Sequence, residues 1–159
     1  MMAEREERLL ARVEDAFGVI SVYEVDDYRF LEFGDAIEQS CVFTADPSWL
    51  EYDYTRAMLV GALCHDQPES ALFLGLGAGT LTQACMKFLP LEDIEAIELR
   101  PDVPRLAMEH LGLDDDPRLY VRIGDAIDLL PTAEKADLLF VDLYTCLLYT
   151  SPSPRDRTR

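Results

Sequence analysis

The sequence lacks the marks of several protein classes. No apolar run approaches the roughly 20 residues that a helix needs to cross a bilayer, so no membrane span is predicted. The acidic start, residues 1–8, does not resemble a signal peptide, and we expect a cytoplasmic protein. The four cysteines form no C-x-x-C pair, which argues against a disulfide framework and against a zinc site. No metal is therefore expected.

Basic residues are also scarce. The chain has 14 Lys and Arg residues against 31 Asp and Glu residues, a formal net charge of −17. The phosphates of nucleic acid need a basic face, so the charge argues against a nucleic-acid partner. An acidic protein suits small cationic ligands better. With 159 residues, 49% of them apolar, the chain can bury the core of one domain.

The sequence pattern predicts a first structural unit over residues 1–46, with a helix and a β-meander. Residues 3–17 carry apolar side chains at helical spacing among Glu and Arg, which predicts an amphipathic helix. From residue 18 the apolar period changes to two. Residues 19–25, 28–33 and 37–43 therefore predict a three-stranded antiparallel meander.

A Rossmann-like domain is predicted over residues 47–144. Asp46-Pro47 is a helix-start signal, and the helix is expected to end near residues 65–68. Strands then alternate with helices, which predicts an α/β fold with a doubly wound, mostly parallel sheet. The expected strands are 71–76, 94–99, 119–123 and 136–143, and the expected helices are 81–88, 101–111 and 126–130.

Three glycines, Gly75, Gly77 and Gly79, follow the first of these strands at alternate positions. Such a turn opens a helix and exposes backbone N–H groups to a ligand. Thr80 stands where a dinucleotide-binding G-x-G-x-x-G motif has its last glycine. The pattern therefore favours a ligand of the S-adenosylmethionine type, which has no diphosphate.

Acidic residues end the next three strands. Glu98 lies where a carboxylate can accept hydrogen bonds from both ribose hydroxyls. Asp125 can accept from an adenine amino group, and it also suits the start of a short helix. Asp142 can bind and deprotonate an amine beside a sulfonium.

These motifs resemble those of the polyamine aminopropyltransferases, the spermidine synthase-like group with a class I S-adenosylmethionine-dependent methyltransferase fold. The resemblance covers about residues 18–144 and includes the meander, which ordinary methyltransferases lack. The matching segments are Gln39-Ser40, the helix around Tyr52, 72–81, 96–99, 116–118, Asp125 and 137–144.

The resemblance implies an aminopropyl transfer from decarboxylated S-adenosylmethionine to a small cationic amine. It implies that the donor is bound by the glycine turn, by Glu98 at the ribose and by Asp125 and Ala126 at the adenine. Gln39 and Tyr52 would line the donor and amine pocket, with Tyr144 beside the substrate. Asp142 would accept the proton of the attacking amine. Oligomers are common in that family, so a homo-oligomer is compatible with the resemblance.

Two positions depart from the family pattern. Ala78 stands where the family usually has an Asp that helps to hold the donor's ammonium group, and Arg100 stands where a Glu-x-Asp motif would end. Two alternatives therefore stay open. One is a methyltransferase that uses intact S-adenosylmethionine, and the other is a non-catalytic nucleoside-binding protein.

The tail, residues 145–159, does not continue the α/β pattern. Residues 146–156 match the translation of a transposase sequencing adaptor, so we interpret the tail as non-native. On that interpretation the sheet is cut after its fourth strand, with an open edge. We expect such a polypeptide to be poorly stable and inactive.

Overall fold

The computed structural model describes residues 7–34 and 37–143. The first four strands are β1 (Glu7–Asp15), β2 (Gly18–Val25), β3 (Tyr28–Phe33) and β4 (Ile37–Phe43). The later strands are β5 (Ser70–Leu74), β6 (Asp93–Glu98), β7 (Leu119–Ile123) and β8 (Leu138–Val141). The helices are α1 (Asp53–Gly61), α2 (Thr80–Phe88), α3 (Asp102–His110) and α4 (Ala126–Leu129), with short 3₁₀ turns η1 (Ala62–Cys64) and η2 (Leu130–Thr132).

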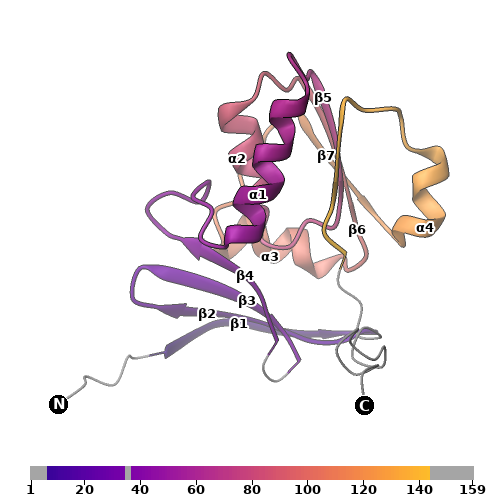
Figure 1. Ribbon diagram of the computed structural model, residues 1–159. Coiled ribbons are helices and arrows are strands. Elements are labelled where there is room, and N and C mark those ends of the chain that lie inside the picture. The colour runs from indigo at the N-terminus through magenta and orange to yellow at the C-terminus, as the bar shows by residue number, and fades with distance from the viewer. Residues whose placement is uncertain (1–6, 35–36, 144–159) are drawn as a thin grey trace, which may run out of the picture.

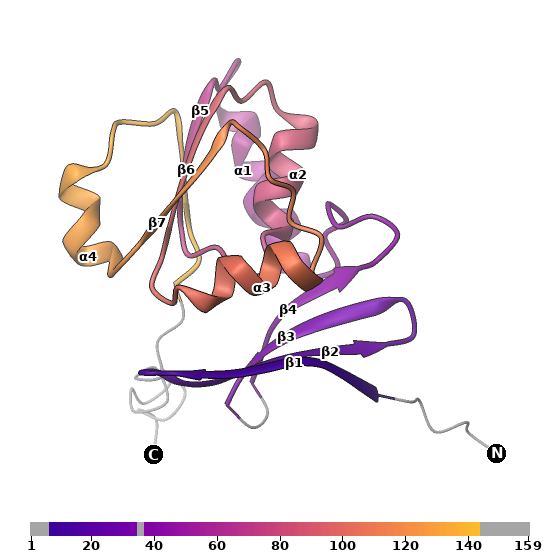
Figure 2. The ribbon, with the colours of Figure 1, turned by 180° about the vertical axis from the view of Figure 1, so that it is seen from behind.

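These strands form two separate sheets (Figure 1). One is antiparallel with the order β1-β2-β3-β4, and the other is parallel with the order β7-β6-β5-β8. Helices α1 and α2 lie on one side of the parallel sheet and α4 on the other, while α3 lies next to the antiparallel sheet (Figure 2). The predicted fold class, a Rossmann-like parallel sheet preceded by an antiparallel meander, is confirmed.

The strand order creates a switch point beside β5. The chain moves outward from β5 through β6 to β7, and then returns to the other side of β5 with β8. In open α/β sheets, ligands bind at the carboxyl ends of the strands where the order reverses in this way. The topology therefore places the glycine turn after β5 at the expected binding edge.

The two sheets share one hydrophobic core. Ile20, Val22 and Leu31 of the antiparallel sheet belong to the same buried cluster as Phe73 of β5 and Leu106 of α3. The antiparallel sheet thus packs against the rest of the chain, so its residues can contribute to the walls of a site in the parallel sheet.

The predicted helix over residues 3–17 is wrong, because residues 7–15 form strand β1. A bulge between Leu9 and Ala11 shifts the pairing with β2. Leu10 and Val13 therefore both pack against the core although they are three residues apart, a spacing that resembles a helix. The meander has four strands instead of three.

The start predicted for the first helix of the second unit is also wrong, since α1 begins at Asp53 and not near Asp46. The Asp46 carboxylate accepts from the backbone N–H and the hydroxyl of Ser48, and it pairs with Lys87 at 2.9 Å. The residue stabilises a local turn, which uses the same side-chain chemistry as a helix cap. Within the described ranges, no helix is long and apolar enough to cross a membrane.

Candidate functional site

A cavity of about 180 Å³ lies at the carboxyl ends of the parallel strands. Its walls come from the ends of β5, β6, β7 and β8, from the start of α1 and from the antiparallel sheet. The lining residues to which the sequence analysis gave a role in the site are Gln39, Tyr52, Gly75, Gly77, Glu98, Asp125, Ala126 and Asp142. The structure thus brings together residues that are up to about a hundred positions apart in the chain.

The glycine turn is held between two other strands. Gly75 has φ of +91° and its N–H donates to the Ile97 carbonyl at 2.8 Å, while the Asp142 N–H donates to the Leu74 carbonyl at 2.9 Å. A Cβ atom on Gly75 would overlap the backbone carbonyl oxygen of Asp142. Glycine at position 75 is therefore what allows the end of β8, and with it Asp142, to approach the turn.

The antiparallel sheet supports the same turn from its other side. Ser40 of β4 accepts a hydrogen bond from the Ala78 N–H at 3.2 Å. A Cβ atom on Gly77, which has φ of +57°, would lie 2.8 Å from the Ser40 hydroxyl oxygen. Close contact between strand β4 and the turn therefore needs a glycine here too.

The Glu98 carboxylate is buried at the end of β6, with 7% of the residue exposed. One oxygen accepts from the Leu76 N–H at 3.0 Å and the other accepts from the Arg100 N–H at 3.1 Å. These two bonds fix the plane of the carboxylate at the cavity wall. Each oxygen keeps capacity for another donor, so the group can accept from two neighbouring hydroxyls.

Asp125 follows β7 and begins α4. Its carboxylate accepts from the Ile127 N–H at 2.8 Å, so the residue caps this short helix and also lines the cavity. Ala126 lies beside it in the wall, and Ile127 adds an apolar side chain that is 80% exposed. This part of the cavity combines an acceptor with apolar surface, as a flat purine ring requires.

A pair of tyrosines stands near Asp142. Tyr54 donates its hydroxyl to Asp142 Oδ2 at 3.3 Å, and Tyr52 donates to Glu38 of β4. The two rings are stacked, with centroids 5.9 Å apart. Burial, with a smaller contribution from Glu32, raises the pKa of the Glu38 carboxyl. A phenol thus donates to each of these two carboxyl groups, and of the two only Asp142 lines the cavity.

Three of the residues named from the sequence need separate comment. Gly79 is the residue just before α2, lies against the Leu113 side chain and does not line the cavity. Ala78 is only 1% exposed and lies in the core. Tyr144 lies outside the described residues. Within the described ranges, no group of three or more His, Cys, Asp or Glu side chains could hold a metal ion.

Sequence reasoning missed Phe33, Tyr54 and the role of Ser40 as a support of the turn. Tyr54 could have been found from its place two residues after Tyr52, because residues at the start of one helix reach the same cavity. Ser40 follows Gln39 in β4 and would be expected on the opposite face, but a bulge in the pairing of β3 with β4 disturbs the alternation, and both residues line the cavity.

Comparison with known proteins gives two kinds of relative. No protein-family profile matches the chain. A polyamine aminopropyltransferase of Vibrio vulnificus is 28% identical over 135 residues, which cover 79% of this chain and 44% of that protein. An eEF1A lysine and N-terminal methyltransferase of Danio rerio is 38% identical over 78 residues, which cover 49% of this chain and 11% of that protein.

Among solved structures, a spermidine synthase in complex with the transition-state analogue AdoDATO superposes with a TM-score of 0.71 at 20% identity. The match covers 85% of this chain and 47% of that one. The chain therefore spans less than half the length of each of these relatives. Its parallel sheet with the attached antiparallel sheet is a spermidine synthase-like fold, of the type found in S-adenosylmethionine-dependent methyltransferases.

Proposed function

We propose that this chain carries the donor-binding site of a spermidine synthase-like transferase, which moves an aminopropyl group from decarboxylated S-adenosylmethionine to a small cationic amine. The observation that carries the proposal is the ring of carboxylates around one cavity: Glu98, Asp125 and Asp142, each at the end of a different parallel strand. Similarity to the Vibrio polyamine aminopropyltransferase supports it.

Glu98 would accept the two ribose hydroxyls of the donor, and Asp125 would accept from the adenine amino group. The glycine turn, with Gly75 and Gly77, would leave room for the donor's sulfonium near Asp142. Gln39 and Tyr52 would form the wall on the amine side. In this arrangement Glu98 would bind the ribose and Asp125 the adenine. Asp142 would then be available for the reaction.

The reaction needs a neutral amine, because an ammonium has no lone pair to attack carbon. Asp142 would take the proton from the amine nitrogen, which then attacks the carbon next to the sulfonium. A C–N bond forms, the C–S bond breaks, and its electron pair stays on sulfur as a neutral thioether. The Tyr54 hydroxyl, as a donor to Asp142, would hold this carboxylate toward the amine.

A methyltransferase is the second candidate, and two observations favour it. The Danio rerio methyltransferase has the higher identity of the two relatives, and Ala78 offers no carboxylate to a cationic donor tail. Intact S-adenosylmethionine carries an additional carboxylate, which an acid at position 78 would repel. The two candidates thus differ in the donor that the cavity prefers.

Calorimetric titration of the chain with both donors tests the proposal. We expect tighter binding of decarboxylated S-adenosylmethionine, because Asp142 lines the cavity near the donor's tail. Much tighter binding of the intact donor would refute aminopropyl transfer and favour the methyltransferase. Absence of binding of either donor would refute both.

Glu98→Gln tests the ribose contact. The substitution removes a charged acceptor, and hydrogen bonds to charged groups contribute about 1.5–3 kcal/mol, so donor affinity should fall about tenfold to a hundredfold. Glu92→Gln is the matched control, since Glu92 is exposed, precedes the same strand and lies outside the cavity wall. Equal affinity of the two variants would contradict the assignment of Glu98.

A further inference from the structure

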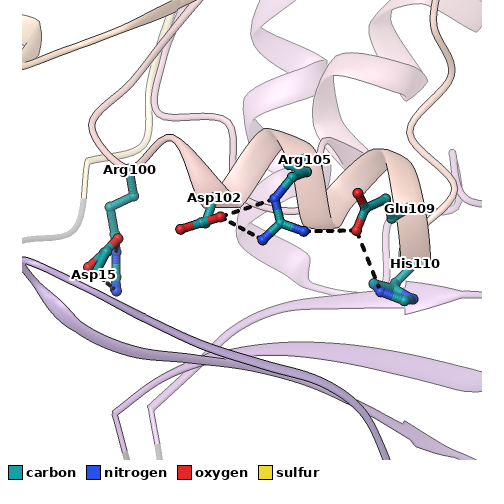
Figure 3. A network of polar contacts seen from close by, with 6 residues as sticks. All are labelled: Asp15, Arg100, Asp102, Arg105, Glu109 and His110. Atoms are coloured by element: carbon teal, nitrogen blue, oxygen red, sulfur yellow. Dashed lines mark hydrogen bonds and ion pairs between the residues drawn. The ribbon is translucent and has the colours of Figure 1, made fainter.

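Arg100 is a buried arginine next to the site that is not part of the cavity wall. Only 6% of its side chain is exposed, although it follows Glu98 by two residues. Its guanidinium donates twice to the Asp15 carboxylate, at 2.8 and 2.7 Å (Figure 3). It also donates once to the Gly18 carbonyl, at 2.7 Å. These partners belong to β1 and β2, so the contact joins the antiparallel sheet to the end of β6.

The same guanidinium lies against the aromatic wall of the cavity. Its central carbon is 4.5 Å from the ring centre of Phe33, and Phe33 lines the cavity at the end of β3. Phe17 lies on another side at 6.0 Å. The Arg100 guanidinium therefore contacts one residue of the cavity wall, Phe33.

The backbone of Arg100 reaches the site directly. Its N–H donates to Glu98 Oε1 at 3.1 Å, while Leu76 holds the other oxygen. The orientation of the Glu98 carboxylate thus depends on where the backbone of residue 100 lies. That backbone is held in turn by a side chain fixed to the antiparallel sheet.

Stability alone does not account for such a pair. Two buried charges lose hydration, and apolar residues of similar volume often stabilise a fold equally well. What the bidentate pair provides is a defined geometry, because a planar guanidinium and a carboxylate meet in only a few arrangements. The contact is therefore suited to fixing an orientation.

We infer that Arg100 is a positioning residue, which holds Glu98 in the orientation that accepts both hydroxyls of a ribose. The inference rests on the proposed function, because it assumes an adenosyl ligand at Glu98. Through Asp15 and Gly18, the antiparallel sheet then contributes to selection of a ribose over a deoxyribose. A purely structural role for Arg100 would affect folding without affecting this selectivity.

The experiment compares the affinities of the full 159-residue chain for adenosine and 2′-deoxyadenosine by calorimetry. Loss of one hydroxyl contact to a charged group should give the unmodified chain a preference for adenosine of about tenfold or more. Arg100→Lys keeps the positive charge but loses the bidentate contact with Asp15, so the preference for adenosine should fall to about threefold or less. Asp15→Asn should lower the preference in the same direction while Arg100 itself is retained.

Two control variants separate positioning from folding. Arg105→Lys changes an exposed arginine of α3, which pairs with Asp102 and Glu109 at the surface (Figure 3), and should leave the preference unchanged. Ile94→Val removes a methyl group from the fully buried start of β6, and should lower the melting temperature without changing the preference.

The outcomes are distinct. If the unmodified chain binds adenosine selectively and the Arg100 and Asp15 variants keep the full preference, the inference is wrong and the proposed function stands. If the Ile94 variant loses the preference as the Arg100 variant does, the effect is general destabilisation and the inference is also wrong. If the unmodified chain does not bind adenosine, the proposed function fails and the inference fails with it.

Discussion

Substitution of Gly75 by alanine should be among the most destabilising changes in the glycine turn. The residue has φ of +91°, and a Cβ atom would overlap the carbonyl oxygen of Asp142. That oxygen belongs to backbone and cannot rotate away. The end of β8 would have to move from β5, and the Asp142 N–H would lose its 2.9 Å bond to the Leu74 carbonyl.

The expected cost has two parts. A residue other than glycine at this φ costs about 1–3 kcal/mol in backbone strain. A buried backbone hydrogen bond that is left unmade adds about 1–3 kcal/mol. The free energy of unfolding should therefore fall by about 2–6 kcal/mol, a large part of the 5–15 kcal/mol typical of a domain.

Two other glycines separate these contributions. Gly18 has φ of +109° with nothing near its Cβ position, so Gly18→Ala should cost only the strain, about 1–3 kcal/mol. Gly61 lies at the end of α1 in open space, so Gly61→Ala should stabilise by about 0.5–1 kcal/mol.

Urea unfolding followed by circular dichroism measures all three variants. The expected order of stability is Gly61→Ala, then the unmodified chain, then Gly18→Ala, and last Gly75→Ala. A Gly75→Ala variant as stable as Gly18→Ala would show that β8 does not press against the turn, and the account of how Asp142 reaches the cavity would fail.

Two further predictions concern single polar contacts. Tyr54→Phe should weaken binding of a primary amine about fivefold, because Asp142 loses a partly exposed donor. Equal affinity in an NMR titration would count against a role for the Tyr54 hydroxyl. Hydrogen bonds from Lys87 and Ser48 lower the pKa of Asp46 from its usual 3.8 to about 2. The ionised carboxylate therefore contributes its full stabilisation above pH 3.8, and this stabilisation is lost as the pH falls to about 2. Asp46→Asn should therefore reduce urea resistance at about pH 5 and make little difference at about pH 2, whereas a deficit independent of pH would refute this.

The parallel sheet and its acidic edge could be predicted because the signals are local. Each strand is short and rich in apolar residues. Glu98 is the last residue of β6, Asp142 directly follows β8, and Asp125 follows β7 after one glycine. Since parallel strands end at one edge, the order along the chain is enough to bring these side chains together. All three side chains line one cavity, and the roles assigned to the residues stay predictions.

What could not be predicted depends on contacts distant in the sequence. Strand β1 is stabilised by pairing with β2 and contains a bulge, and neither feature can be recognised in a short window of sequence. Tyr54 meets Asp142 across 88 positions, and Arg100 meets Asp15 across 85. Arg100 follows a strand that the sequence identified, but no pattern indicates that its side chain turns back to the antiparallel sheet.

Ala78 bears most directly on the choice between the two donors. Its side chain is 1% exposed and lies in the core, so the turn is packed around an apolar group at this position. An acid there would have to bury its charge or displace the turn from Ser40, which accepts from the Ala78 N–H. The side chain at position 78 therefore contributes no charge to the cavity. We expect Asp142 to decide which of the two donor tails binds more tightly. A carboxylate on the tail would meet that acid, whereas an ammonium alone would be attracted by it. This is the physical reason to expect the decarboxylated donor, even though the family's usual acid is missing from the turn.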